Sequence, residues 1–168
     1  MKNLTTLMTS DSNEWYTPDD IINRVLKTFE TIDLDPCSNS HLTPCIPAAK
    51  HFTKDDNGLS KKWHGRIYMN PPYGREIKAW VEKLISEYLQ GNIIEAIALL
   101  PARIDTQWFN LLTEYPWCGI RGRLKFSGWK DAAPFPSCVF YLGNSPSAFF
   151  VAFRDMGPIY TKVNSGGK

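Results

Sequence analysis

Near its middle the chain reads Arg66-Ile67-Tyr68-Met69-Asn70-Pro71-Pro72-Tyr73-Gly74. Residues 66–69 have the character of a short strand, and a helix-like stretch begins at about Arg75. The two prolines fix φ at about −65° and supply no backbone N–H, so their carbonyl groups must point at another partner. Open α/β folds bind ligands where a strand ends in such a loop. The stretch therefore predicts a strand, a rigid site loop and a helix.

The side chains beside the two prolines indicate what this loop binds. An amide at Asn70 and an aromatic ring at Tyr73 form a clamp suited to a flat group that carries an amine. We therefore interpret Asn70, Pro71, Pro72 and Tyr73 as a catalytic motif. The alternative is a proline-rich turn with no binding role.

Length and composition limit the class of protein. A chain of 168 residues is long enough for one domain with its own core. The net charge of +2 does not indicate a nucleic-acid binder, although clustered basic residues would still allow one. The four cysteines contain no C-x-x-C pair, and residues 1–14 hold no apolar stretch of signal-peptide length. We expect free thiols, a cytoplasmic location and no membrane partner.

Apolar residues recur at helical spacing in two clear places. Residues 18–29 form one amphipathic helix, for which Thr17 is the expected N-cap and Pro18 suits the first turn. Residues 77–89 form a second one, which ends at Gly91. Two helices with one apolar face each need a sheet or other helices to cover that face.

Strand candidates alternate with the helices. They are residues 31–35, 48–53, 66–69, 93–100, one or two short strands within 117–126, and 137–142 and 148–154. A further helix is expected over residues 105–115, with Asp105 as its cap. Five residues separate the last two strands, which predicts an antiparallel hairpin. The order predicts a three-layer α/β/α fold around a mainly parallel sheet, closed by this C-terminal hairpin.

Domain boundaries follow from the same pattern. We expect a flexible N-terminal arm over residues 1–13, one domain over residues 14–160 and a flexible tail over residues 161–168. The loop after Asp35 and the loop after Met69 both belong at the carboxyl edge of the sheet, so the two should face one crevice.

Several motifs in combination resemble one family of amino-methyltransferases. They are Asp35-Pro36-Cys37-Ser38, Asn70-Pro71-Pro72-Tyr73, Glu14-Trp15-Tyr16-Thr17-Pro18, Leu100-Pro101-Ala102-Arg103, Asp105-Thr106, Trp108-Phe109, Gly122-Arg123-Leu124-Lys125-Phe126 and Ala133-Pro134-Phe135-Pro136-Ser137. Together they resemble the phage and prophage DNA N-6-adenine-methyltransferase (Dam) family. The resemblance extends from about residue 13 to about residue 143.

The resemblance implies a single Rossmann-like class I methyltransferase domain that uses S-adenosylmethionine to methylate adenine N6 in DNA. It implies that Asn70 and Pro71 accept the two N–H groups of the amine, while Tyr73 stacks on the ring. The adenine would have to leave the double helix to reach them. It further implies a phage or prophage enzyme of the DNA-modification or restriction-modification kind, located in the cytoplasm of a bacterial host.

Acidic residues are the main candidates for cofactor contacts. Asp35 is the expected partner of the methionine ammonium or the ribose, and Asp33 is the less favoured alternative. Asp55 or Asp56 would accept from a ribose hydroxyl or the adenine amine, although either could instead cap a turn. No G-x-G follows Asp35, which departs from the wider methyltransferase pattern. The other expected cofactor-binding residues are Pro36 and Cys37 beside Asp35 and, by resemblance, Trp15, Thr17 and Pro18.

Double-stranded DNA is the expected partner. The expected DNA-binding residues are Arg103, Arg123, Lys125, Phe135 and Ser137. Further candidates for phosphate contact are Lys61, Lys62, Arg66, Arg121 and Lys130, and a solvated surface is the alternative for each. No segment is long enough for a separate recognition domain, so we expect a short or relaxed target sequence. The oligomeric state stays open.

The sequence also permits other interpretations. Cys37, His41, Cys45 and His51 have a spacing that permits zinc, but the prolines around them disfavour a helical site and we expect no metal. Cytosine N4, RNA adenine or a glutamine side chain could replace DNA adenine as substrate. An inactive nucleic-acid-binding protein could also keep the fold, although binding alone would not need both Asp35 and the Asn70 motif.

Overall fold

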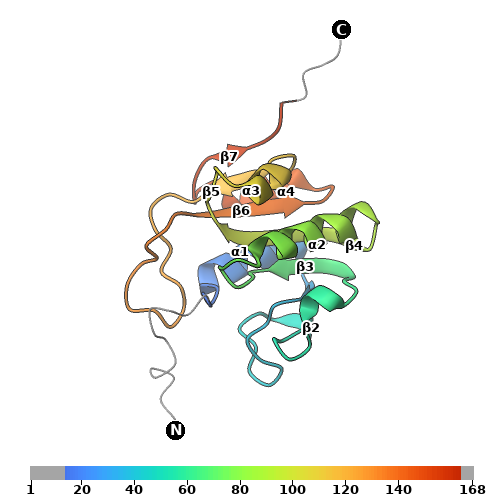
Figure 1. Ribbon diagram of the computed structural model, residues 1–168. Helices are drawn as coiled ribbons and strands as arrows, with labels where there is room; N and C mark the ends of the chain where they lie inside the picture. The colour runs from blue at the N-terminus through green and yellow to red at the C-terminus, as the bar shows by residue number, and fades with distance from the viewer. Residues whose placement is uncertain (1–13, 164–168) are drawn as a thin grey trace.

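The computed structural model describes residues 14–163, and within this range the chain folds around one seven-stranded sheet (Figure 1). The strands are β1 (Ile32–Asp35), β2 (Ala48–His51), β3 (Gly65–Met69), β4 (Ile93–Pro101), β5 (Trp117–Gly119), β6 (Ser137–Leu142) and β7 (Ile159–Tyr160). Their order in the sheet is β2-β1-β3-β4-β6-β5-β7. The first four are parallel neighbours, and the pairs β4–β6, β6–β5 and β5–β7 are antiparallel.

Helices cover both faces of this sheet. They are α1 (Asp19–Phe29), the short 3₁₀ helix η2 (Gly58–Ser60), α2 (Ile77–Leu89), α3 (Gln107–Leu112) and α4 (Pro146–Phe153). Helix α2 packs beside α3, in front of the sheet in Figure 1, and α1 packs beside α4 to form the second helix layer. The expected three-layer α/β fold with a parallel central sheet is confirmed.

The central strand and the first helix follow directly from their residues. In β4 every residue except Ile94 is buried, as its nearly continuous apolar run requires in a strand with neighbours on both sides. In α1 the buried residues include Ile21, Val25 and Phe29, which recur at helical spacing. Both elements are therefore fixed by burial of apolar side chains.

The expected C-terminal hairpin is wrong in its second half. Residues 137–142 form β6, but residues 148–153 belong to helix α4. Strand β6 already has β4 on one side and β5 on the other, so it has no free edge for a hairpin partner. Pro146 begins the helix, and Phe149 and Phe153 are buried one turn apart. Strands β5 and β7 complete the antiparallel side instead.

Two expected helix caps are also wrong. The residue before α1 is Pro18, with no side-chain capping bond, because the hydroxyl of Thr17 faces Tyr68 on β3. Helix α3 is capped by Thr106, one residue after the expected Asp105, and the Thr106 hydroxyl oxygen accepts a backbone hydrogen bond of the first turn. Thr17 is thereby free for a role in the site.

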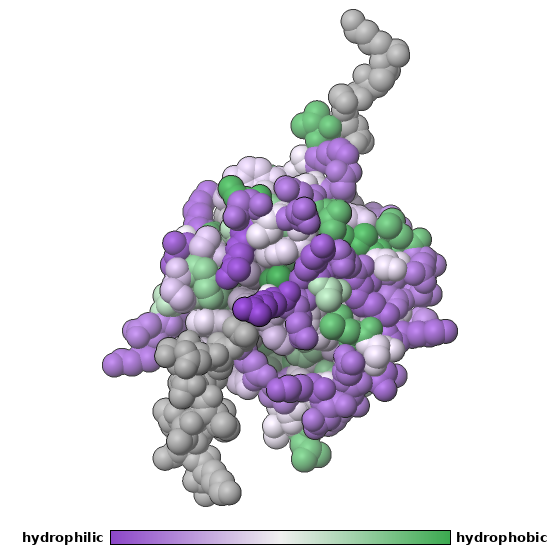
Figure 2. All heavy atoms as spheres, viewed as in Figure 1, coloured by the Kyte–Doolittle hydropathy of each residue, from purple (hydrophilic) through white to green (hydrophobic). Residues whose placement is uncertain are grey.

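The described residues bury their large apolar side chains in one cluster between the layers. Exposed apolar residues are spread over different elements, such as Leu42, Leu89 and Val151, and Figure 2 shows green residues scattered among purple ones on the face drawn. None of the helices within residues 14–163 has the length and hydropathy to cross a bilayer. The expected arm of residues 1–13 lies outside the described residues, as do residues 164–168.

Candidate active site

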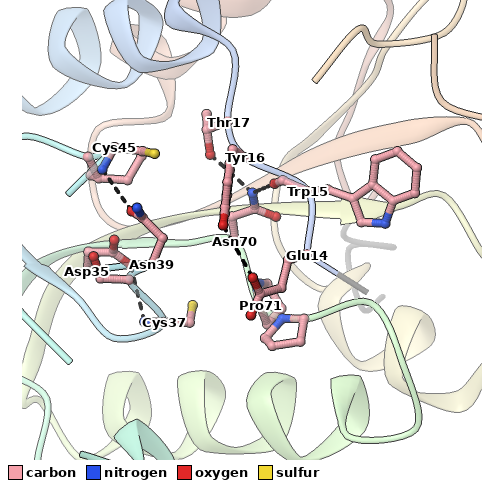
Figure 3. Close-up of a pocket in the computed structure, with 13 residues that line it drawn as sticks. Glu14, Trp15, Tyr16, Thr17, Asp35, Cys37, Asn39, Cys45, Asn70 and Pro71 are labelled. Carbon is pink, nitrogen blue, oxygen red and sulfur yellow. Dashed lines mark hydrogen bonds between the residues drawn. The ribbon is translucent and has the colours of Figure 1, made fainter. Parts of the chain in front are cut away.

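Two loops meet at the carboxyl ends of β1 and β3. Because these strands are parallel neighbours, with Leu34 opposite Ile67, the loop after Asp35 and the loop from Asn70 lie at one edge of the sheet. Together with residues 14–17 they enclose the hollow drawn in Figure 3. It is lined by Glu14, Trp15, Tyr16, Thr17, Asp35, Cys37, Ser38, Asn39, Cys45, Ile46, Asn70, Pro71 and Pro72. The predicted meeting of the two loops is confirmed.

The side-chain amide of Asn70 is held at its nitrogen and left open at its oxygen. Nδ2 donates to the backbone carbonyl of Trp15 at 2.5 Å and to Oγ1 of Thr17 at 3.1 Å. Oδ1 is buried and has no hydrogen-bond partner within residues 14–163. A buried carbonyl oxygen without a partner is costly for a folded protein, and it marks a place where a donor fits.

The Trp15 carbonyl also settles which end of the Asn70 amide faces the hollow. A backbone carbonyl can only accept, so the atom of Asn70 that faces it must be the NH₂ nitrogen. Rotating the amide by half a turn would bring two carbonyl oxygens together and would present N–H groups to the hollow. The network therefore presents an acceptor to any ligand.

Asp35 supplies the only carboxylate of β1 that lines the hollow. It is 3% exposed, and its Oδ1 accepts a hydrogen bond from the Cys37 backbone N–H at 3.1 Å. Burial raises the pKa of its carboxyl group to about 6, against the opposing effect of that hydrogen bond. Asp33, the alternative, accepts from the Arg66 backbone N–H at 2.7 Å and does not line the hollow. Of the two acids, Asp35 is placed to meet a cationic ligand.

A second hollow adjoins the first across Cys37, Ser38 and Pro72. Its lining adds Pro36, Thr53, Lys54, Asn57, Gly58, Leu59, Glu76 and Trp80 to residues shared with the first. About 470 and about 1380 Å³ of space, part of it open to solvent, lie along the first and the second hollow. Trp80 is buried there, and its Nε1 donor lacks a partner among the described residues.

Backbone packing keeps the loop after Asp35 in place. A Cβ atom on Gly58 would lie 2.1 Å from the Pro36 carbonyl oxygen, so only glycine permits this approach. Burial raises the pKa of the Cys37 thiol well above its usual value, so the thiol is neutral. Pro36 and Cys37 thus lie where cofactor contacts were expected, without supplying charge.

Of the three N-terminal residues expected to bind cofactor, two line the hollow. Trp15 and Thr17 do, whereas Pro18 does not and instead precedes α1. Asn39 and Cys45 also line it, although sequence reasoning missed them. Asn39 accepts from the Cys45 backbone N–H at 2.9 Å, which closes the irregular loop on itself. Its position just after the Asp35 motif was the available signal, while Cys45 offered none.

Tyr73 lies behind the hollow and does not line it. The ring is 7% exposed, and its hydroxyl donates to the Leu99 carbonyl at 3.2 Å. The rings of Phe126 and Phe135 meet it edge to face, with centroids 6.2 and 5.5 Å away. Stacking of Tyr73 on a target ring stays a prediction.

The structure places Asp55 and Asp56 outside both hollows. Asp56 accepts from the backbone N–H and hydroxyl of Thr53 and bonds His41 at 2.6 Å. The hydrogen bonds from Thr53 lower the pKa of this carboxyl group. Asp56 is thus committed to its own turn, which was the alternative, and Asp55 is exposed nearby. Neither lines the space where the expected ligand would bind.

The expected DNA-binding residues come from two linked loops. Arg103, Arg123 and Lys125 are exposed. The Ala102 N–H donates to the Pro136 carbonyl at 2.8 Å, which ties the loop after β4 to the loop before β6. We call these two loops, residues 102–106 and 121–136, the outer loops. Their basic side chains are accessible to a large polyanion.

The two other expected DNA-binding residues, Phe135 and Ser137, are less accessible. Phe135 is half-buried and packs on Trp15 with a centroid distance of 4.9 Å. Ser137 is 1% exposed, and its Oγ has no partner among the described residues. Arg66 points elsewhere: it pairs with Glu95 on the neighbouring strand at 3.0 Å, at the start of β3 and away from the site edge. Its expected phosphate contact is therefore not supported by its position.

The described residues contain no group of side chains that fits the zinc alternative. Within residues 14–163 no group of three or more His, Cys, Asp or Glu side chains converges as metal ligands do. His41 bonds Asp56, and His51 bonds the Ile46 carbonyl at 2.8 Å. Both imidazoles are thus engaged with partners of their own.

Comparisons with known proteins agree with this geometry. The family described as DNA N-6-adenine-methyltransferase (Dam) matches residues 4–133, which is well over half of the chain. Among solved structures, the 23S rRNA methyltransferase ErmE is similar in fold, with a TM-score of 0.50 and 12% identity over 78% of this chain and 70% of that chain. No curated protein sequence matches. The chain belongs to the DNA N-6-adenine-methyltransferase (Dam) family, and its methyl donor is S-adenosylmethionine.

Proposed function

We propose that this protein methylates the N6 amine of an adenine that has been flipped out of double-stranded DNA. The observation that carries the proposal is the unpartnered Oδ1 of Asn70, a buried acceptor fixed at the edge of the hollow. A hydrogen-bond acceptor binds a hydrogen-bond donor, and an exocyclic amine offers two N–H donors. The family match supports adenine N6 as the position.

The residues around the hollow fit the methyl donor. Asp35 offers a buried carboxylate to the methionine ammonium, and a cation there would remove the cost that raises its pKa to about 6. The adjoining hollow, with Trp80 Nε1 unpartnered, offers room and a donor for the nucleoside half. When bound, S-adenosylmethionine supplies a methyl group on a positively charged sulfur.

The Asn70 side chain and the Pro71 carbonyl do the positioning. The adenine amine is a weak nucleophile because its lone pair is delocalised into the ring. Asn70 Oδ1 and the Pro71 carbonyl each accept one N–H, which holds the nitrogen and favours a geometry with the lone pair free. As the nitrogen gains positive charge, both oxygens stabilise it, and the surplus proton passes to water. No strong base is required.

The burial of Asn70 Oδ1 supports an extrahelical target base. Oδ1 is buried in a hollow lined by side chains, so an amine paired inside a duplex cannot reach it. The outer loops would contact the phosphates on either side, with Arg103, Arg123 and Lys125 as the main cations. Phe135, beside Trp15 and Tyr73, would form one wall of the base site.

The proposal is tested by transfer of a labelled methyl group to separate substrates. The purified protein is incubated with labelled S-adenosylmethionine and duplex DNA, RNA or protein. The nucleic acids are then hydrolysed to nucleosides and the protein to amino acids. Label in N6-methyladenine from DNA is the expected result. Label in cytosine, in RNA alone or in protein would contradict the assignment.

A matched pair of variants ties that result to the site. Asn70→Ala removes the acceptor and should abolish most of the transfer, while Asn110→Ala changes an exposed asparagine on α3 and should not. Calorimetry with S-adenosylmethionine identifies an inactive binding protein, which would give no heat of binding.

A further inference from the structure

Asn70 owes its orientation to two residues that precede α1. Both of its Nδ2 hydrogens are used, one by the Trp15 carbonyl and one by the Thr17 hydroxyl oxygen, as the close-up in Figure 3 shows. We infer that Thr17 is a positioning residue that aims the Asn70 acceptor, and that it does not act as a contact for the methyl donor. This inference rests on the proposed function, since it assigns Asn70 the role of acceptor.

Two acceptors are needed to fix an amide plane. One hydrogen bond to Trp15 selects which end of the amide faces inward, but it leaves rotation about the Cβ–Cγ bond. The second bond, to Thr17 at 3.1 Å, removes that freedom and sets the direction of Oδ1. Terminal amide torsions are otherwise broad, so the support has to come from neighbours.

Thr17 is itself held through both its side chain and its backbone. Its Oγ1 lies 2.8 Å from the Tyr68 hydroxyl on β3, and its carbonyl accepts from the Ser127 hydroxyl at 3.1 Å. The residue is 3% exposed. The backbone of Tyr16 is bonded to Ser127 as well, at 2.9 Å. Hydrogen bonds to strand β3 and to the loop at Ser127 therefore fix the position of the Thr17 hydroxyl just before α1.

The hydrogen bonds of Thr17 leave little of its hydroxyl for a ligand. The oxygen accepts from Asn70 Nδ2 and is bonded to the Tyr68 hydroxyl, so two of the three hydrogen-bonding positions of the hydroxyl are occupied. A contact residue and a positioning residue also differ in kinetics. Loss of a contact residue weakens binding of S-adenosylmethionine, whereas loss of a positioning residue lowers the rate of methyl transfer after binding.

The test compares Thr17→Val, Thr17→Ser and a control, Thr28→Val. Valine keeps the shape of threonine without the hydroxyl, and serine keeps the hydroxyl. Thr28 is also a buried threonine, on α1, but its hydroxyl donates to the Arg24 carbonyl within the same helix and it does not line the hollow. The control therefore measures what loss of a buried hydroxyl does to folding alone.

Thr17→Val should lower kcat by about 10- to 100-fold, the size of effect that a small misplacement of a reacting group produces. The KM and Kd for S-adenosylmethionine should stay within about twofold of the wild type. Thr17→Ser should restore most of kcat, and Thr28→Val should leave it unchanged. A Thr17→Val enzyme with wild-type kcat, or with weakened cofactor binding at unchanged kcat, overturns the inference.

A readout independent of activity is the side-chain amide signal of Asn70 in an NMR spectrum, identified by its loss in Asn70→Asp. Both hydrogens should exchange slowly with water in the wild type, and one should exchange faster in Thr17→Val. If the Asn70 amide hydrogens exchange at the same rates in Thr17→Val as in the wild type, the inference is overturned. If the wild type methylates no adenine, the proposed function fails, and this signal still decides whether Thr17 holds Asn70.

Discussion

The side-chain nitrogen of Asn70 donates a hydrogen bond to the backbone carbonyl of Trp15, which lies 55 residues earlier in the chain. A backbone carbonyl is present whatever residue occupies position 15, so the contact depends on the path of the chain before α1. It leaves Oδ1 of Asn70 as the open acceptor of the site. An aspartate in place of Asn70 would lose this arrangement although it keeps acceptor oxygens.

Asn70→Asp is therefore expected to be both inactive and less stable. One carboxylate oxygen would face the Trp15 carbonyl without a proton between them, which costs about 1–3 kcal/mol for a buried polar group left unpaired. In a chain of this length the melting temperature should fall by about 2–4 °C for each kcal/mol. Calorimetric melting and the transfer assay measure the two effects. Wild-type activity in this variant would show that the nitrogen bonds do not orient the side chain.

Binding of S-adenosylmethionine should weaken in acid because Asp35 becomes protonated. Its carboxyl group has a pKa of about 6 in the free protein, raised by burial. Below that pH the ionised fraction falls about tenfold per unit, and affinity for a cationic group should fall with it. Calorimetric titrations from pH 5 to pH 8 should show affinity rising and then levelling above about pH 6.

Asp35→Asn is the control for that titration. It should bind the cofactor weakly and with little dependence on pH in the same range. The folded pKa of Asp35 lies above the ordinary value of 3.8, so the wild type also loses stability as pH rises through about 6. Asp35→Asn should lack this loss. A wild type whose affinity is flat between pH 5 and pH 8 would exclude Asp35 as the ammonium partner.

Tyr73 should tolerate loss of its hydroxyl better than loss of its ring. Tyr73→Phe removes one hydrogen bond to the Leu99 carbonyl, worth about 1 kcal/mol, and keeps the ring that packs on Phe126 and Phe135. Tyr73→Ala should cost about 3–5 kcal/mol, as for a buried aromatic residue. Urea unfolding measures both. If Tyr73→Phe were inactive at unchanged stability, the hydroxyl would have a direct part in transfer.

Salt dependence should separate phosphate contacts from other basic residues. Arg123→Gln and Lys125→Gln should each weaken DNA binding and reduce the slope of log affinity against log salt by about 1. Arg66→Gln should leave the slope unchanged, because Arg66 pairs with Glu95 away from the site edge. Fluorescence anisotropy with duplex DNA at several salt concentrations gives these slopes. Slopes left unchanged by Arg123→Gln and Lys125→Gln would mean that the outer loops do not contact the DNA phosphates.

The sequence predicted those parts of the fold that local pattern and strand order determine. The apolar run of β4 and the apolar face of α1 depend on spacing alone. The meeting of Asp35 and Asn70 follows because neighbouring parallel strands end at one edge. The strand predicted over residues 148–154 is wrong, because residues 148–153 lie in helix α4. Whether β6 has a free edge for such a strand depends on the order of the whole sheet.

The details of the site needed the three-dimensional structure. Thr17 has the sequence pattern of a helix cap, but its hydroxyl lies beside that of Tyr68, a contact across 51 positions. Asp56 has ordinary turn chemistry, and only its bonds to Thr53 and His41 show that it is committed there. Tyr73 is placed behind the hollow by aromatic rings from the loop before β6. Such contacts between distant residues carry no local sequence signal.

The most direct test of the central claim is the amount of N6-methyladenine formed in duplex DNA in a single turnover, measured by mass spectrometry of nucleosides. Wild-type protein and Asn70→Ala are compared at saturating S-adenosylmethionine, with binding of the cofactor verified for both. We predict N6-methyladenine from the wild type and a loss of at least about a hundredfold in the variant, since positioning of the amine is removed. Comparable yields from the two proteins, or methyl groups on another base, would contradict the account.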